Sequence, residues 1–152
     1  MNDTISLCRN QVMGFFRDLD DNAYDSLVGR MTPDGIWHRQ GKILNGRADV
    51  LRALSARSPT MRIHHLISNL YADQADERRC VMRGYMLVVR HDSGRPLQGP
   101  APLSGIENIR TTHIELVRLD DAWLIARMRN DEPSFAMQAQ ASEAQTITRN
   151  TQ

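Results

Sequence analysis

The spacing of apolar residues changes along the chain, from a helical period at the start to strand-like alternation later. In residues 5–19 apolar side chains recur every three or four positions, which predicts an amphipathic helix. The inward positions of this helix are predicted to be Leu7, Val12, Phe15, Phe16 and Leu19. A short second helix is predicted to bury Tyr24, Leu27 and Val28 and to stop at Gly29.

The segment between the second helix and residue 59 mixes turn signals with one more helical pattern. Residues 32–35 (Thr-Pro-Asp-Gly) predict a turn, 36–39 the beginning of a strand and 41–46 a loop. A third helix is predicted over 47–57, with Asp49 in its first turn, where the helix dipole favours an acid.

Beyond Pro59, apolar and polar residues alternate over four long segments. These predicted strands span about 61–72, 79–91, 105–119 and 122–130. Acidic hairpin turns connect them, except where a Gly- and Pro-rich segment, 92–104, predicts a longer loop. Helices followed by an antiparallel meander predict an α+β fold rather than alternating βαβ units. A curved sheet of this kind can wrap around helices and leave a cavity.

Length and composition predict one globular domain. The chain has 152 residues, of which 41% are hydrophobic and 24% are charged, as in ordinary globular proteins. Residues 1–135 are predicted to form this domain, and the Gln-, Ala-, Ser- and Thr-rich segment 136–152 is predicted to be a flexible tail.

The charge pattern narrows the expected partners and location. The net charge is +1 and the basic residues are scattered, so no nucleic-acid partner is expected. The polar N-terminus does not resemble a signal peptide, and no apolar run approaches the roughly 18 residues that cross a bilayer. These features predict a cytoplasmic protein without a membrane partner. Cys8 and Cys80 are then expected to be free thiols, with a single disulfide as the alternative.

The strongest site signal lies in the strand predicted over 61–72. With a period of two, His65 and Asn69 share a face with apolar residues, and burying two polar side chains is costly unless they find partners or a ligand. The sequence therefore predicts that His65 and Asn69 lie side by side in a pocket. The alternative is a hydrogen-bonded core histidine without a ligand.

Several short motifs, in order along the chain, resemble the SnoaL-like branch of the NTF2-like superfamily, which includes scytalone dehydratase, polyketide cyclases and small subunits of aromatic-ring dioxygenases. The matching segments are Leu19-Asp-Asp-Asn-Ala-Tyr-Asp-Ser-Leu27, Asp34-Gly-Ile-Trp-His38, Gly46-Arg-Ala-Asp-Val-Leu51, Arg62-Ile-His-His-Leu-Ile-Ser-Asn69 and Leu119-Asp-Asp-Ala-Trp-Leu-Ile-Ala-Arg127. The resemblance implies an NTF2-like cone, with three N-terminal helices in the concave face of a curved, mainly antiparallel sheet.

The resemblance also implies roles for particular residues. His65 matches the cavity histidine of the dehydratase relatives, and Asp20 matches an acid near the ligand of scytalone dehydratase. For Asp20 the alternative is a turn and capping role before the second helix. In place of the strand-one tyrosine stands His38 or Arg39, and in place of the later cavity asparagine stands Thr112. The catalytic set of scytalone dehydratase is therefore half present, and its reaction is not carried over.

These observations together define the predicted site. His65 and Asp20 are the catalytic candidates, because a histidine near its usual pKa can exchange a proton at neutral pH. The substrate-binding candidates are Asn69, Tyr24, Trp37, His38, Tyr85 and Thr112. No metal is expected, because the histidines and cysteines lack ligand-type spacing, and no cofactor motif occurs.

Two functions are compatible with this sequence. The first is a cofactor-free lyase or isomerase, of dehydratase or cyclase type, acting on a small hydrophobic or aromatic carbonyl compound in the cone cavity. The second is a binding or assembly module without chemistry, like the small subunit of the aromatic-ring dioxygenases. Either is expected to form a homodimer or trimer through the outer sheet face, where Leu87, Val89, Val117 and Ile125 are predicted to be exposed.

Overall fold

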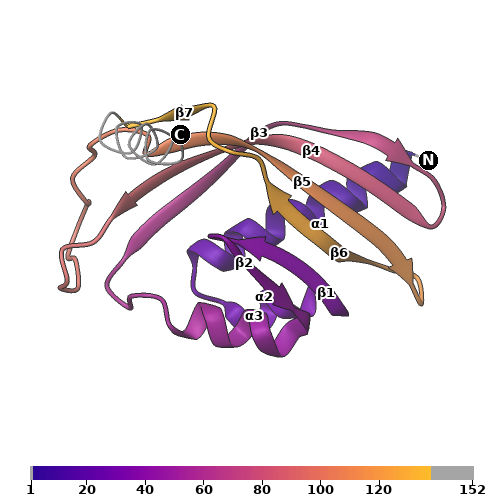
Figure 1. Ribbon diagram of the computed structural model, residues 1–152, viewed down its shortest axis with the longest axis horizontal. Helices are drawn as coiled ribbons and strands as arrows, with labels where there is room; N and C mark the ends of the chain where they lie inside the picture. The colour runs from indigo at the N-terminus through magenta and orange to yellow at the C-terminus, as the bar shows by residue number, and fades with distance from the viewer. Residues whose placement is uncertain (1, 138–152) are drawn as a thin grey trace, which may run out of the picture.

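Three helices lie beneath one face of a curved, seven-stranded sheet (Figure 1). The computed structural model describes residues 2–137. The helices are α1 (Asn2–Asp20), α2 (Tyr24–Gly29) and α3 (Gly46–Ser55). The strands are β1 (Met31–Arg39), β2 (Lys42–Asn45), β3 (Arg62–Ala75), β4 (Arg79–His91), β5 (Asn108–Leu119), β6 (Ala122–Asn130) and β7 (Phe135–Ala136).

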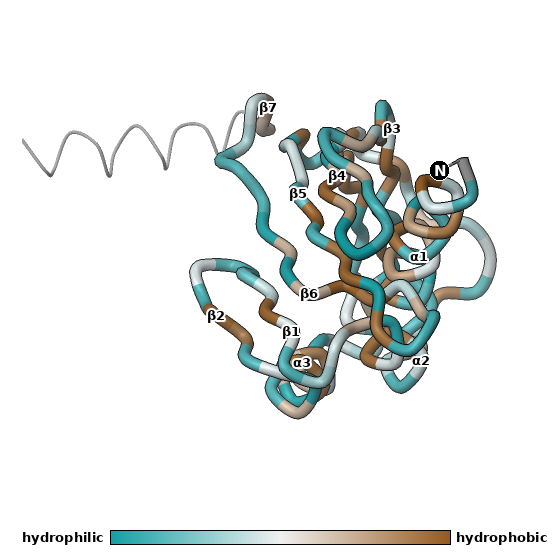
Figure 2. The backbone as a smooth tube through the Cα atoms, turned by 90° about the vertical axis from the view of Figure 1, so that its right-hand side faces the viewer, coloured by the Kyte–Doolittle hydropathy of each residue, from teal (hydrophilic) through white to brown (hydrophobic). Residues whose placement is uncertain are grey.

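The sheet has the strand order β2-β1-β6-β5-β4-β3, and the short β7 pairs with β5. Neighbouring strands are antiparallel except for β1 and β6, which run parallel. The predicted α+β class and the mainly antiparallel sheet are therefore confirmed. Figure 2 shows hydrophobic and hydrophilic residues alternating along β4 and β5, as expected for strands with one face on the core.

The inward face of α1 differs from the prediction at its first position. Leu7 is 54% exposed, whereas Cys8 is completely buried. The buried residues are Cys8, Val12, Phe15, Phe16 and Leu19, a stripe with the 3–4 spacing of one helix face. Cys8 packs against Cys80 of β4 as a free thiol, and burial raises the pKa of both thiols.

The segment predicted as a turn and a loop forms a hairpin instead. Residues 32–35 belong to β1, where the pairing with β6 shifts between Met31 and Ile36. Pro33 has no N–H to donate and Gly35 lies tightly against the Ile125 carbonyl, so these residues produce an irregularity within the strand. Gln40 and Gly41 both have positive φ and join β1 to β2 in a two-residue turn.

A bulge in β3 reverses which side chains face the core. The register against β4 shifts between Ser68 and Tyr71, and Asn69 adopts a left-handed backbone with φ of 54°. Up to Ile67 the odd-numbered residues face inward, whereas Leu70 and Ala72 do so after the bulge. Two side chains of β3 that simple alternation assigns to the same face therefore lie on opposite faces when the bulge lies between them.

One residue assigned to the outer sheet face is buried in the core. Ile125 has no exposed surface, because the pairing of β5 with β6 shifts after Glu115 and brings Ile125 opposite Leu116. Leu87, Val89 and Val117 do lie on the outer face and are partly exposed. The prediction for Ile125 was wrong because a bulge changes strand parity.

Two further predictions concern the C-terminal tail and the absence of a membrane-spanning helix. Of the predicted tail, Ala136 pairs with Asn108 as part of β7, and residues 138–152 lie outside the described residues. Within the described chain, no helix combines the length and the apolar character required to span a bilayer.

The β3 bulge depends on a glycine in the neighbouring strand. A Cβ on Gly84 would lie 3.0 Å from the Ser68 carbonyl and 3.1 Å from the Leu70 Cα. We therefore expect Gly84→Ala to lower the free energy of unfolding by about 1–3 kcal/mol, the usual cost of overpacking against backbone. Gly29→Ala is the control, because nothing lies within 4 Å of its Cβ position. Urea unfolding of both variants measures this, and equal stability would contradict the role of Gly84.

Candidate active site

A cavity of about 450 Å³ lies between the end of α1 and the inner face of the sheet. Its apolar wall is formed mainly by Phe16, Leu19, Trp37, Met61, Ile63, Met86, Val88 and Met128. Its polar wall is formed by Arg39, Gln40, Arg57, His65, Arg90, Glu107, Asn108, Arg110, Asn130 and Glu132. The cavity is therefore divided into an apolar and a charged part, because charged ends of β1, β4 and β5 converge around the apolar wall.

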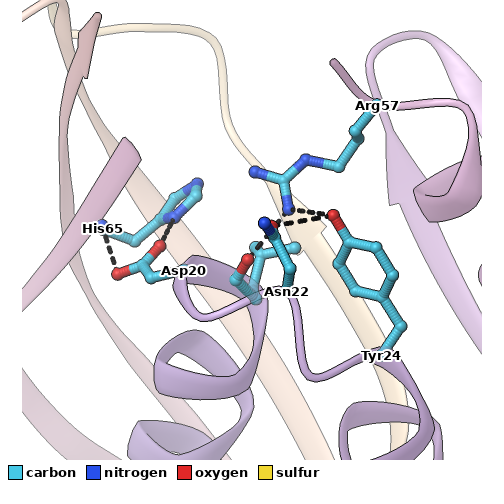
Figure 3. Close-up of polar contacts among 6 residues, drawn as sticks. Asp20, Asn22, Tyr24, Arg57 and His65 are labelled. Atoms are coloured by element: carbon cyan, nitrogen blue, oxygen red, sulfur yellow. Dashed lines mark hydrogen bonds and ion pairs between the residues drawn. The ribbon is translucent and has the colours of Figure 1, made fainter. Parts of the chain in front are cut away.

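Asp20 and His65 form the central contact of this site (Figure 3). The His65 backbone N–H donates to Asp20 Oδ2 at 2.9 Å, and the His65 Nδ1 lies 2.6 Å from Asp20 Oδ1. Both carboxylate oxygens of Asp20 thus contact the same residue, His65. Asp20 is the last residue of α1, so this contact joins the helix end to the beginning of β3. The structure brings together the two residues that the sequence selected.

The carboxylate determines how the imidazole is protonated. A carboxylate only accepts hydrogen bonds, so His65 Nδ1 must carry the proton, and this tautomer is assigned from the hydrogen-bond network. In a neutral imidazole, Nε2 then carries the lone pair. The side chains of His65 and Asp20 are 11% and 10% exposed, and the His65 ring lies 5.7 Å from the Phe16 ring. His65 is therefore packed, oriented and in contact with the cavity.

Asn69 does not lie beside His65. It is exposed on the outer side of the sheet, where its Oδ1 accepts a hydrogen bond from Ser68 Oγ at 2.6 Å. It borders a separate outer depression together with Tyr71, Tyr85 and Thr111. The prediction failed because the bulge at Asn69 reverses the strand parity, which periodicity alone does not reveal.

The other predicted substrate-binding residues are divided between the two sides of the sheet. Trp37 is 4% exposed and lines the cavity. Tyr85 is 49% exposed and lies on the outer face. His38 follows Trp37 in β1 and points to the other face, so Arg39 rather than His38 borders the cavity. Thr112 is completely buried, one inward position beyond the cavity-lining Arg110, and is absent from the cavity wall.

Tyr24 contributes to the site through another residue. Its hydroxyl donates to Asn22 Oδ1 at 2.9 Å and accepts a hydrogen bond from Arg57 Nη1 at 3.2 Å. Arg57 Nη1 also donates to the Leu19 carbonyl at 2.9 Å. Figure 3 shows the Arg57 guanidinium extending from the end of α3 toward the side of the site that holds His65. Tyr24 therefore positions Arg57 at the cavity wall.

Sequence analysis missed several polar residues of the cavity. Asn108 and Arg110 lie on the same inward parity of β5, so the alternation of the predicted strand could have identified them. Arg110 Nε donates to Asn108 Oδ1 at 3.2 Å. Arg57 and Asn130 lie at element ends, where no periodic pattern indicates the direction of a side chain. Among residues 2–137, no group of three or more His, Cys, Asp or Glu is placed to hold a metal ion.

Comparison with known proteins agrees with this architecture. The sequence profile of the SnoaL-like domain matches residues 5–129. No protein of curated function matches the sequence.

Three similar solved structures show the same fold. ActVI-ORFA from Streptomyces coelicolor has 18% identity and a TM-score of 0.68, over 82% of this chain and 94% of that chain. A Novosphingobium aromaticivorans protein provisionally named scytalone dehydratase has 18% identity and a TM-score of 0.69, over 91% and 94%. An NTF2-like protein with a cystatin-like fold from the same organism has 15% identity and a TM-score of 0.69, over 90% and 86%. With the helices under a curved sheet and a cavity between them, this chain belongs to the SnoaL-like domain family.

Proposed function

We propose that this protein is an acid–base enzyme, a lyase or isomerase, that acts on a small hydrophobic carbonyl compound in the cavity. The observation that carries this proposal is the two-point contact between Asp20 and His65 at the cavity wall. A structural histidine needs partners but no adjacent space, whereas His65 borders a cavity of about 450 Å³. This space also disfavours the alternative of a non-catalytic assembly module with a filled core.

His65 Nε2 is the proposed general base. It would remove a proton from the carbon next to the substrate carbonyl, and the bonding electrons would move onto the carbonyl oxygen to form an enolate. Asp20 would stabilise the imidazolium that results, without taking its proton. In an isomerisation, the imidazolium would then protonate a different carbon of the substrate. In a dehydration, it would protonate a hydroxide that departs from the substrate, which gives water and an unsaturated ketone. Each step uses only groups of this chain and the substrate.

Asn108 is the proposed stabiliser of the enolate oxygen, in place of the expected Asn69. His65 and Asn108 are both paired with Val88, from opposite sides, and all three side chains face the cavity. The Cα atoms of His65 and Asn108 are then about 10 Å apart, since neighbouring strands are about 4.8 Å apart. Because Asn108 Oδ1 accepts from Arg110, its amide N–H groups remain available to a substrate oxygen in that gap.

The role of His65 can be tested with 2-tetralone, a neutral bicyclic ketone. We expect the protein to accelerate deuterium exchange at the carbons next to the carbonyl in D₂O, followed by NMR. His65→Ala should lower this protein-dependent rate by about 10²–10⁴, the usual effect of losing a positioned base. His64→Ala is the matched control, because His64 is exposed on the opposite face of the same strand.

Thermal unfolding of the same two variants separates catalysis from folding. If His65 has only a structural role, His65→Ala should destabilise the protein by about 1–3 kcal/mol and leave the exchange rate of the folded fraction unchanged. That combination would contradict the proposal.

The role of Asp20 can be tested through the tautomer of His65. In Asp20→Asn the amide oxygen can still accept the His65 backbone N–H, while the amide N–H₂ faces Nδ1 and favours the tautomer protonated at Nε2. We expect ¹⁵N NMR of the imidazole to show this change, and the exchange rate to fall by about 10²–10⁴. Asp21→Asn, at the exposed neighbouring position, should leave both unchanged. A wild-type spectrum with Nε2 already protonated would refute the assignment.

We also propose that copies of this chain associate through the outer sheet face, as a homodimer or trimer. Paired residues place Leu66, Leu87, Ile109 and Phe135 in one row across β3, β4, β5 and β7. Leu66 is 49% exposed and Phe135 is 70% exposed. Contiguous apolar surface of this kind marks contact faces. The same face also carries both positive and negative side chains, such as Arg83 and Asp73, so two copies can match each other's charges in a symmetric contact.

Sedimentation at micromolar concentration tests this association. We expect the wild type to sediment as a dimer or trimer and Leu66→Arg to sediment as a monomer with an unchanged thermal midpoint. Leu103→Arg is the matched control, because Leu103 is 78% exposed in the loop before β5 and is not part of the row. Wild-type protein that sediments as a monomer would contradict the proposal.

A further inference from the structure

Three of the four arginines at the cavity wall, Arg39, Arg57 and Arg110, lack an acidic partner among residues 2–137. Arg90 forms an ion pair with Glu107, and Arg110 is bonded to Asn108. Neither Arg39 nor Arg57 has a carboxylate oxygen within 4.0 Å among residues 2–137, and the Asn108 amide that Arg110 contacts is neutral. The cavity therefore has three cationic groups without an acidic partner in the described chain, and only Arg110 among them has its guanidinium bonded to a neighbouring residue of the same strand.

Arg39 and Arg57 line the same cavity, where the charge of one acts on the other. The positive charge of Arg57 and partial burial both lower the pKa of Arg39, and burial has the larger effect. The Arg39 guanidinium lies 5.6 Å from the centre of the Trp37 ring, its only contact of this kind within the described residues. Two neighbouring cations with reduced access to water destabilise the empty site, and an anion bound between them would relieve this repulsion.

Arg57 has N–H donors without a hydrogen-bond partner in the described chain, and their arrangement suits a carboxylate. Its Nη1 uses its two N–H bonds on the Leu19 carbonyl and the Tyr24 hydroxyl. Its Nε is buried and has no hydrogen-bond partner in the described part of the chain. The free Nε–Nη2 edge is the edge with which arginine holds the two oxygens of a carboxylate. Figure 3 shows Tyr24 holding the guanidinium from the opposite side.

We infer that Arg39 and Arg57 form a binding site for a carboxylate group of the substrate, so that the cavity selects acids with a bicyclic aromatic or similarly apolar body. The apolar body would lie against Trp37, Met86 and Met128, which line the same cavity. A monoanion fits better than a phosphate dianion, because Glu107 and Glu132 also line the cavity and reduce its positive potential. This inference rests on the proposed function only in that the same cavity is the substrate site.

Binding of an isosteric pair of probes tests the inference directly. The probes are 1-naphthylacetic acid and 1-naphthylacetamide, which differ in charge but hardly in shape, with affinities measured by titration calorimetry at low ionic strength. We expect the acid to bind at least about tenfold more tightly than the amide, as expected for charge-assisted, two-point hydrogen bonding. 1-Naphthyl phosphate should bind less tightly than the acid.

Substitutions identify the groups responsible. Arg39→Gln should remove most of the preference for the acid and leave amide affinity within about twofold, since Arg39 makes no hydrogen bond in the described structure. Arg57→Lys retains the charge but not the two-point edge, and should reduce the preference in part. Arg95→Gln is the matched control for net charge, because Arg95 is exposed in the loop before β5 and lines neither the cavity nor the outer depression at Asn69. It should retain the full preference.

The outcomes separate this inference from the proposed chemistry. Equal binding of acid and amide, or a preference that survives both Arg39→Gln and Arg57→Lys, would overturn the carboxylate site. Tighter binding of the phosphate than of the acid would overturn the choice of a monoanion. The deuterium exchange of 2-tetralone, a neutral ketone, requires no carboxylate on the substrate, so its failure would reject the proposed base and leave this binding result standing.

Discussion

The site depends on how a single carboxylate is satisfied. Asp20 lies at the end of α1, is 10% exposed and directs both oxygens at His65, one to the backbone N–H and one to Nδ1. A mostly buried carboxylate without donors would be unstable, so this pairing holds the helix end against β3 and orients the imidazole at the same time. The attachment of the helix end to β3 and the tautomer of the histidine thus depend on the same contact.

The cavity combines two environments because different elements supply its two ends. Apolar side chains come from the inward faces of α1 and the central strands, which pack as a core elsewhere in the fold. Arginines come from places where strands and helices end, such as Arg39 at the end of β1 and Arg57 just after α3. Tyr24 and the Leu19 carbonyl hold Arg57 in place. An apolar body with an acidic group matches this division better than a uniformly apolar molecule.

Bulges decide which side chains of a strand face the cavity or the core. In β3, the shift at Asn69 moves that residue to the outer face, and Gly84 in β4 leaves space for the displaced backbone. In β6, a comparable shift turns Ile125 into the core. Each bulge changes parity by one, so the same strand presents different sets of residues to the cavity before and after it. Asn108 of β5, across Val88 from His65 in a regular part of the sheet, is the amide that faces the cavity instead.

The sequence by itself determined the features that follow from local periodicity and residue type. These are the order of helices and strands, the α+β class, and the pairing of His65 with Asp20, for which the family motifs supplied the correspondence. Only the tertiary structure decided what depends on register and on element ends. Asn69 and Tyr85 proved to face outward, and Arg39 and Arg57 converged on one cavity from segments 18 residues apart in the chain. The physical reason is that a bulge or a helix end redirects a side chain without changing the local hydrophobic pattern, so the direction becomes fixed only when neighbouring strands pack.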